Sequence, residues 1–439
     1  MTKEALKQSL MQMVMPYIIG AEDNSTIIIQ KEEQPLVITR YGTKITRVNY
    51  NYKGESGSVT FPIIKKAYLL DKNAGQLEYD VLSLYSCFGA KVPHPYECQN
   101  GILLMEDFGN KTLEKILKTK ENKADELVAK TFLSLREFHK AGRKVEESLF
   151  KKFPVIKKRI KKEFNALKEK IGDYYFLLTG EEEALKLYCQ GYRQRTGEEK
   201  EFIYNARFIL NNLQENPQLV HADLTTYHSF VLPVPEGWAI GFIDHNNPRL
   251  RNTAVDYGYL AFSPGANLNI ETILDMNEAM LNRRIFSGES IGKKENIIKN
   301  ENKRILYAGL HSFIRRAART REIKTRFPEQ YKLFSESHPA YTNIDFYLNK
   351  LNSLAGFLET SNRITLADDE GKALEKLAPV ALRIIEDSKG ESKKENENLQ
   401  SNNYPIKETL EKSRKYVGKL TSRFSRLFTF SKCRKIAQL

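Results

Sequence analysis

The pattern of apolar and polar residues changes along the chain and divides it into regions of different expected structure. Between residues 25 and 70, β-branched and aromatic runs alternate with turn residues, which predicts strands with a hairpin connection at 53–57. From residue 74 the apolar positions recur at helical spacing, which predicts one helix. A further short strand is expected at 101–109. The first hundred residues are therefore predicted to form a small sheet with one helix packed on it.

The remainder of the chain has mostly helical patterning with one interruption. Residues 124–142 form a clear amphipathic pattern, and Gly142 is expected to end that helix. Residues 150–213 and 256–385 are typical of further helices, whereas 219–244 breaks the pattern with two short strands. We therefore expect an α+β fold, in which a small antiparallel sheet precedes a mostly helical region.

The carboxy-terminal segment differs in composition from the rest. Residues 388–403 contain one apolar residue, which predicts a disordered linker because burial cannot offset the ordering entropy. Nine Lys and Arg residues and no acidic residue lie in 412–439, where apolar residues recur at helical spacing. We expect this tail, 405–439, to contact an anionic membrane surface or an acidic partner; a helix docked on its own domain is the alternative.

Composition narrows the class of protein further. The chain has 439 residues, 41% of them apolar and 28% charged, which is typical of a globular protein. The formal net charge of +14 is concentrated in the tail, and no specific nucleic-acid motif is present. Four scattered cysteines do not make a disulfide framework or a zinc site. No apolar run reaches membrane-spanning length, so we expect a soluble, cytoplasmic protein, either free or peripheral to the membrane.

The two short strands predict a meeting of acidic side chains. A turn at 234–237 pairs Pro233 with Trp238, which places position 228 opposite Ile243 and next to Asp244. The loop that contains Asp223 then lies at the same end of the hairpin as Asp244. Two nearby carboxylates fit a divalent-metal or acid/base site, although such residues beside short strands often make only turn hydrogen bonds.

A wider pattern favours the first reading. The segment HADLTTYH, the hairpin, and then FIDHNNPRLRNTAVDYGYLA resemble the catalytic core of aminoglycoside and choline kinase-like phosphotransferases. That core has the pattern H-x-D-x-x-x-x-N, then I-D-[FW], then a structural Asp about twelve residues later. The matching residues of this chain are His221, Asp223, His228, Asp244 and Asp256.

The resemblance implies a bilobal protein kinase-like fold and assigns roles to residues. Asp223 would orient the acceptor hydroxyl and take its proton, His221 would brace the loop, and Asp244 and His228 would hold Mg²⁺, or Mn²⁺ as an alternative. The implied organisation is an N-terminal extension (1–35), an N-lobe (36–107), a helical C-lobe (108–387), a linker (388–404) and the basic tail (405–439).

The amino-terminal half fits the same resemblance. A kinase-like N-lobe needs a loop over the phosphates, a lysine on the third strand, a glutamate that holds the lysine, and a hinge that receives the adenine. Lys66 could replace Lys65 as that lysine. The residues implied to bind ATP are Gly42, Thr43, Lys44, Lys65, Glu78, Met105, Glu106 and Asp107.

One residue departs from the family pattern and leaves the activity open. His228 stands where the family has Asn, and Mg²⁺ prefers oxygen ligands. The interpretation is a phosphotransferase that transfers phosphate from ATP to a hydroxyl of a small molecule and either uses one well-held metal ion or borrows Asn246 or Asn247 as a ligand. The alternative is a catalytically silent nucleotide-binding or scaffold protein. Basic segments such as 157–162 disfavour a polycationic aminoglycoside as acceptor.

Overall fold

The computed structural model describes most of the chain between residues 28 and 373. The described residues are 28–38, 43–54, 57–69, 72–119, 124–152, 154, 157–158, 161–162, 211–235, 237–245, 249–266, 268–282, 291–326, 331–332, 335–336 and 343–373. The expected linker, the basic tail and most of the expected helical stretch 150–213 lie outside the described residues. Of the expected extension, 1–35, only residues 28–35 are described, and they belong to a strand. No helix in this described part is long and apolar enough to cross a membrane.

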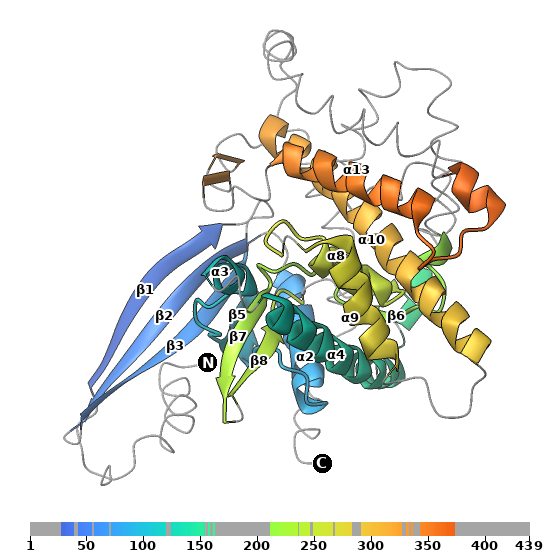
Figure 1. The fold of residues 1–439 in the computed structure, drawn as a ribbon. Helices are drawn as coiled ribbons and strands as arrows, with labels where there is room; N and C mark the ends of the chain where they lie inside the picture. The colour runs from blue at the N-terminus through green and yellow to red at the C-terminus, as the bar shows by residue number, and fades with distance from the viewer. Residues whose placement is uncertain are drawn as a thin grey trace, which may run out of the picture. The chain divides into compact units, whose positions relative to one another are not determined.

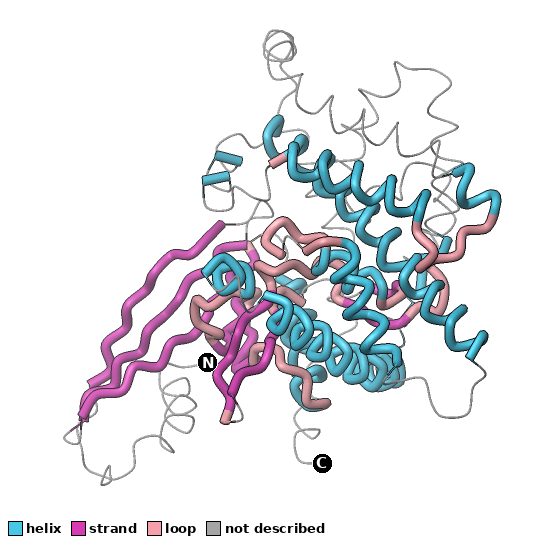
Figure 2. The backbone as a smooth tube through the Cα atoms, in the orientation of Figure 1, coloured by secondary structure: helices cyan, strands magenta, loops and turns pink. Residues whose placement is uncertain are grey.

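The described residues form two compact units. The first comprises 28–83 and 93–107, and the second comprises 84–92 and 108–373. The α+β fold expected from the sequence is confirmed, since an antiparallel sheet is followed by a largely helical remainder (Figures 1 and 2).

The first unit is built on a five-stranded sheet. Its strand order is β1-β2-β3-β5-β4, and every neighbouring pair is antiparallel. Strands β1 to β3 run side by side as a long ribbon in Figure 2, and only the second half of β3 pairs with β5. The elements of this unit are β1 (Ile28–Ile38), β2 (Thr43–Gly54), β3 (Gly57–Tyr68), α2 (Lys72–Cys87), β4 (Pro95–Gln99) and β5 (Ile102–Glu106), and the last turn of α2 belongs to the second unit.

Two details of this sheet were not predicted from the sequence. β1 is one continuous strand, because a bulge between Pro35 and Val37 accommodates the proline without ending the pairing. Strand β4 was not predicted, since Pro95–Gln99 is short and mostly polar. The core between the sheet and α2 contains fully buried residues of α2 and β5, namely Val81, Leu82 and Leu103.

The second unit has helices and two small antiparallel sheets. β6 pairs with β9, and β7 pairs with β8 as the predicted hairpin. Its elements are α3 (Leu113–Thr119), α4 (Ala124–Lys152), β6 (Gln218–Val220), β7 (Ser229–Val234), β8 (Gly237–Phe242), β9 (Arg249–Arg251), α8 (Ala254–Ala261), α9 (Ile270–Asn282), α10 (Ile291–Arg326) and α13 (Ile344–Thr360).

Two glycines within helices of this unit allow neighbouring elements to pack closely against them. The prediction that Gly142 ends a helix is wrong, because α4 continues to Lys152. A Cβ at Gly142 would lie 3.1 Å from Leu219 O and from Tyr85 Oη, so glycine serves close approach there. Gly258 in α8 faces α10, and a Cβ on it would lie 2.5 Å from Ala308 Cβ.

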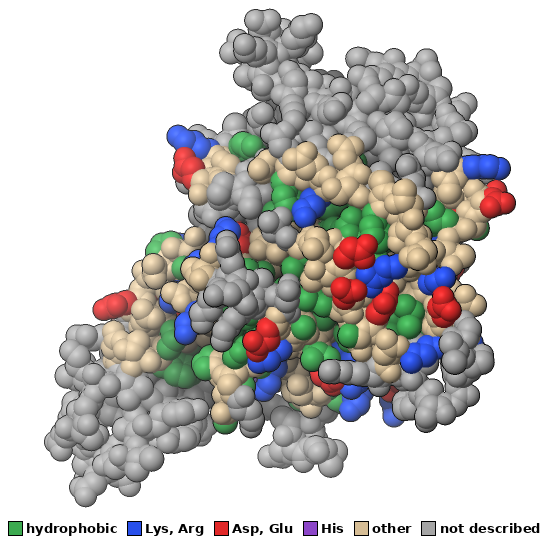
Figure 3. Space-filling model, in the orientation of Figure 1, with side chains coloured by type: hydrophobic (Ala, Val, Ile, Leu, Met, Phe, Trp, Pro, Cys, Tyr) green, Lys and Arg blue, Asp and Glu red, His purple; other side chains and the backbone are tan. Residues whose placement is uncertain are grey.

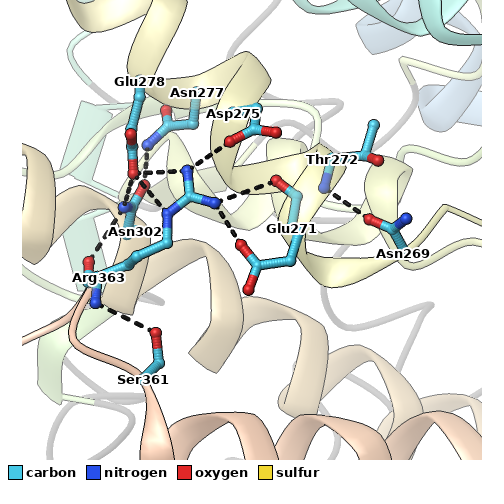
Figure 4. Close-up of polar contacts among 9 residues, drawn as sticks. All are labelled: Asn269, Glu271, Thr272, Asp275, Asn277, Glu278, Asn302, Ser361 and Arg363. Carbon is cyan, nitrogen blue, oxygen red and sulfur yellow. Dashed lines mark hydrogen bonds and ion pairs between the residues drawn. The ribbon is translucent and has the colours of Figure 1, made fainter.

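An ionic cluster fastens the turn after α13 to α9 (Figure 4). The Arg363 guanidinium contacts the carboxylates of Glu271, Asp275 and Glu278, which lie on one face of α9. Asn302 of α10 bonds to Glu278 and to the Arg363 carbonyl. Acidic and basic side chains alternate across the described surface that Figure 3 presents, without a large patch of one charge.

Candidate active site

A buried ion pair joins β3 to α2 in the first unit. Lys66 Nζ lies 2.9 and 3.1 Å from the two carboxylate oxygens of Glu78, and the side chains are 4% and 0% exposed. The Tyr68 hydroxyl also donates to Glu78. A buried charge without its partner is strongly destabilising, so the two groups must stay in contact. Each side chain therefore holds the other in place.

The sequence interpretation assigned this lysine position to Lys65, and the Lys65–Glu78 pairing is wrong. Lys65 Nζ instead lies 3.4 Å from Glu33 in β1, and its side chain is 29% exposed. Successive residues of a strand face opposite sides of the sheet, so only one of two adjacent lysines can meet α2. That lysine is Lys66, which the sequence left as the alternative.

The expected phosphate loop is shorter than the sequence indicated. Thr43 and Lys44 already belong to β2, where they pair with Tyr68 and Ala67 of β3. Strand residues have regular backbone geometry with hydrogen-bonded neighbours, so they are not loop residues. The connection between β1 and β2 is residues 39–42, and Gly42 lies outside the described residues.

The expected hinge follows β5 and is tied to its neighbours. The Glu106 backbone N–H donates to His94 O at 2.9 Å, and its carboxylate accepts the His94 N–H at 3.1 Å. Asp107 is held by Arg47 of β2, whose Nε and Nη2 lie 2.5 and 3.2 Å from the two carboxylate oxygens. Met105 is buried in the sheet. The Glu106 N–H is therefore already used and cannot serve an adenine.

The hairpin of the second unit has the predicted register. Pro233 pairs with Trp238, and Ser229 pairs with Phe242. One step further, the Ile243 N–H donates to His228 O at 3.0 Å. The loop that carries Asp223 and the residue that precedes Asp244 thus lie at the same end of the hairpin.

Histidine side chains fasten this loop. His221 Nε2 donates to Ile243 O at 2.7 Å, and His228 Nδ1 donates to Asp223 O at 2.8 Å. Burial lowers the pKa of His228, while the charges of Asp244 and Asp223 oppose that shift. Both carboxylates therefore act on the same half-buried imidazole.

Asp256 of α8 anchors the loop that contains Asp223. One carboxylate oxygen accepts the Ala222 N–H at 2.7 Å, and the other accepts the His221 N–H at 2.9 Å and lies 2.9 Å from His139 Nε2. The Asp256 side chain is completely buried. A carboxylate that accepts several hydrogen bonds in a dry environment holds its donors strongly.

Two residues at the site have left-handed backbone conformations. Ala222 has φ of 62° and Asp244 has φ of 69°. Aspartate tolerates this region because its side chain can bond locally, whereas alanine is strained by roughly 1–2 kcal/mol. The two hydrogen bonds from His221 and Ala222 to Asp256 offset this strain and keep Asp223 at the tip of a rigid loop.

The donor set fits a metal that a nucleotide helps to hold. Within the described residues, no group of three or more His, Cys, Asp or Glu side chains could hold a metal ion. Mg²⁺ and related ions are often bound by only one or two protein groups together with water and phosphate oxygens. Asp244 and His228 could supply those two groups, and the substitutes Asn246 and Asn247 lie outside the described residues.

Several residues around the site had no sequence signal. His245 packs edge-on against His221 at 4.8 Å between ring centroids, and it lies directly after Asp244. His139 reaches Asp256 from α4, 117 positions away in sequence. A polar residue within an amphipathic helix does not reveal a partner at that separation.

No protein-family model and no curated protein matches the chain in sequence. Solved structures do match. An ethanolamine kinase from Plasmodium vivax is 14% identical, with 75% of this chain and 82% of that chain covered and a TM-score of 0.42. A choline/ethanolamine kinase family protein from Mesorhizobium loti is 11% identical, with coverage of 85% and 99% and a TM-score of 0.39.

An aminoglycoside phosphotransferase, APH(3'')-Id from Streptomyces rimosus, is 13% identical. The match covers 69% of this chain and 98% of that chain, with a TM-score of 0.31. The structural neighbours of the chain are thus small-molecule kinases of the choline, ethanolamine and aminoglycoside type.

Proposed function

We propose that this protein is a protein kinase-like phosphotransferase that moves the terminal phosphate of ATP to a hydroxyl group of a small molecule. The observation that carries the proposal is the arrangement around Asp223. A strained loop, anchored by a buried carboxylate, presents one aspartate beside the hairpin end that presents a second. Strained, over-determined backbone of this kind is concentrated at functional sites.

The residues divide the chemistry between them. Asp223 would orient the acceptor hydroxyl and accept its proton as the oxygen bonds to phosphorus and the bond to the ADP oxygen breaks. Asp244 and His228 would hold a divalent cation, which neutralises charge on the β- and γ-phosphates when bound. Lys66, fixed by Glu78, would neutralise charge on the α- and β-phosphates.

Fewer hinge groups can bind the adenine than the sequence suggested, because the Glu106 N–H already donates to His94 O. The Arg47–Asp107 pair would fix the hinge backbone, and groups of Met105, Glu106 and Asp107 other than the Glu106 N–H would receive the base. The loop that contains Gly42 would cover the phosphates. Thr43 and Lys44 would support it from the start of β2.

The adjacent lysines of β3 provide a matched experiment. ATP hydrolysis and an ADP-release screen of hydroxyl acceptors would be measured with Mg²⁺ and Mn²⁺. Asp223→Asn and Asp244→Asn should lower turnover about 100-fold or more. Lys66→Met should lower kcat/KM for ATP at least about tenfold, whereas Lys65→Met should change it little, since Lys65 is paired on the opposite face. Unchanged turnover in both aspartate variants would refute the proposal.

A second candidate follows from the donor set. Among the described residues, no group of three or more His, Cys, Asp or Glu side chains could hold a metal ion, and His228 stands where the family pattern has Asn. A silent nucleotide-binding protein would bind ATP in a calorimetric titration without turnover, and His228→Asn would not restore turnover. Turnover by the wild-type protein excludes this candidate.

The acceptor and the partners are also proposals. We propose a neutral or anionic small-molecule acceptor, and contact of the tail, 405–439, with an anionic membrane or an acidic partner. Deletion of 405–439 should then sharply reduce sedimentation with anionic liposomes. Equal binding of liposomes by the truncated protein would refute the proposed membrane contact.

A further inference from the structure

We propose that the cation of this site is bound through a ring nitrogen, Nε2 of His228, and that the site consequently selects Mn²⁺ over Mg²⁺. The inference rests on the proposed function, because the remaining ligands would come from the nucleotide. It concerns which ion the chain selects, a property that the resemblance to kinases does not supply.

The first step is the tautomer of His228. Nδ1 lies 2.8 Å from the backbone oxygen of Asp223. A carbonyl oxygen can only accept a hydrogen bond, so Nδ1 carries the proton and donates. In the neutral ring Nε2 then has a lone pair and no hydrogen. An imidazole whose other nitrogen donates to a backbone carbonyl is the usual form of a metal-binding histidine.

The second step is the rigidity of the ring. The His228 N–H donates to Thr225 O at 3.1 Å, and its carbonyl accepts the Ile243 N–H at 3.0 Å. The ring faces that of His221 at 6.0 Å between centroids and contacts Tyr227 at 5.5 Å. Because both backbone groups and one ring nitrogen are fixed, Nε2 keeps one direction. A ligand that is positioned in advance binds a metal without an ordering cost.

The third step is the neighbouring charge. Asp244 directly follows Ile243, whose N–H bonds to His228 O, and the backbone oxygen of Asp223 accepts the hydrogen bond of the imidazole. One carboxylate and one imidazole, completed by phosphate oxygens and water, form a mixed oxygen–nitrogen set. Mg²⁺ takes almost only oxygen ligands, whereas Mn²⁺ and later first-row ions accept imidazole readily. This chemistry favours Mn²⁺.

A spectroscopic experiment tests the nitrogen ligand directly. The full-length protein would be loaded with Mn²⁺ and a non-hydrolysable ATP analogue, with unlabelled and with ¹⁵N-labelled histidine, and examined by electron spin-echo envelope modulation. Wild-type protein should show nitrogen coupling that changes with the isotope. His228→Asn should lose it, and the ratio of Mg²⁺ to Mn²⁺ dissociation constants should fall about tenfold or more.

Two matched histidine variants complete the design. His245→Asn removes a second imidazole near the site, that of the residue directly after Asp244. The nitrogen coupling should persist in this variant. His94→Asn changes an exposed histidine of the first unit and should alter neither coupling nor metal preference. Should His228→Asn fail to fold, the isotope effect in wild-type protein together with its persistence in His245→Asn still decides the question.

The outcomes separate this inference from the proposed function. Nucleotide and Mn²⁺ binding without nitrogen coupling would overturn the inference and leave the phosphotransferase intact. Coupling that survives in His228→Asn but disappears in His245→Asn would also overturn it. An absence of nucleotide binding under all conditions would refute the proposed function itself.

Discussion

Alteration of Asp256 should strongly disturb the second unit. Its carboxylate accepts the N–H groups of His221 and Ala222 and lies 2.9 Å from His139 Nε2. Asp256→Asn keeps the shape but leaves only one acceptor oxygen for these donors. Charge-assisted hydrogen bonds contribute about 1.5–3 kcal/mol each, and a buried donor without an acceptor costs about 1–3 kcal/mol. We therefore expect the free energy of unfolding to fall by about 2–4 kcal/mol.

The only tryptophan of the chain, Trp238, provides the assay. It lies in β8 of the same unit, beneath Lys130 at 3.9 Å from the ring centroid. Urea unfolding followed by its fluorescence should show a midpoint lowered by about 1 M, with an unchanged slope. Asp369→Asn, at an exposed position near the end of the described chain, should change stability by less than about 0.5 kcal/mol. An equal effect of the two variants would refute the anchoring role of Asp256.

Three further predictions concern packing, pH and salt. Gly258→Ala should cost about 2–3 kcal/mol in thermal unfolding because its Cβ would meet Ala308, whereas Gly356→Ala in α13, with open space around it, should stabilise by about 0.5–1 kcal/mol; equal signs would contradict the packing argument. Burial raises the pKa of Asp80 to about 6, so the folded protein binds its proton more tightly and stability should fall as pH rises from about 4 to 6. Asp80→Asn should remove that slope in denaturant unfolding followed by circular dichroism, and an unchanged slope would assign it to other groups. Arg363→Met should lower stability by about 1–2 kcal/mol at low salt and less in 1 M NaCl, because its three ion pairs are partly exposed; a loss independent of salt would point to packing instead.

The hairpin shows what local sequence can determine. The turn residues between Pro233 and Trp238 fix the pairing of the strands on both sides, so the position of Asp244 relative to His228 followed from a short segment. The same holds for the antiparallel ribbon of the first unit, whose strands are joined by short connections.

The choice between Lys65 and Lys66 shows what local sequence cannot determine. A shift of one residue moves a side chain to the other face of a sheet. Which face receives α2 depends on the pairing of β3 with β5, where Lys66 lies opposite Leu103, 37 positions later in the chain. The interactions of His139 and Arg47 join residues even farther apart, 117 and 60 positions, and no periodicity in their own segments reveals them.

The anchoring of the loop by Asp256 also sets an order of events during synthesis. The strained segment at Ala222 is complete 34 positions before its anchor. A ribosome that has made the loop and not yet released α8 holds a chain in which Asp256 cannot yet accept these hydrogen bonds. The native geometry of the loop therefore forms only after the anchor emerges and docks, and nascent fragments that end before residue 256 lack it.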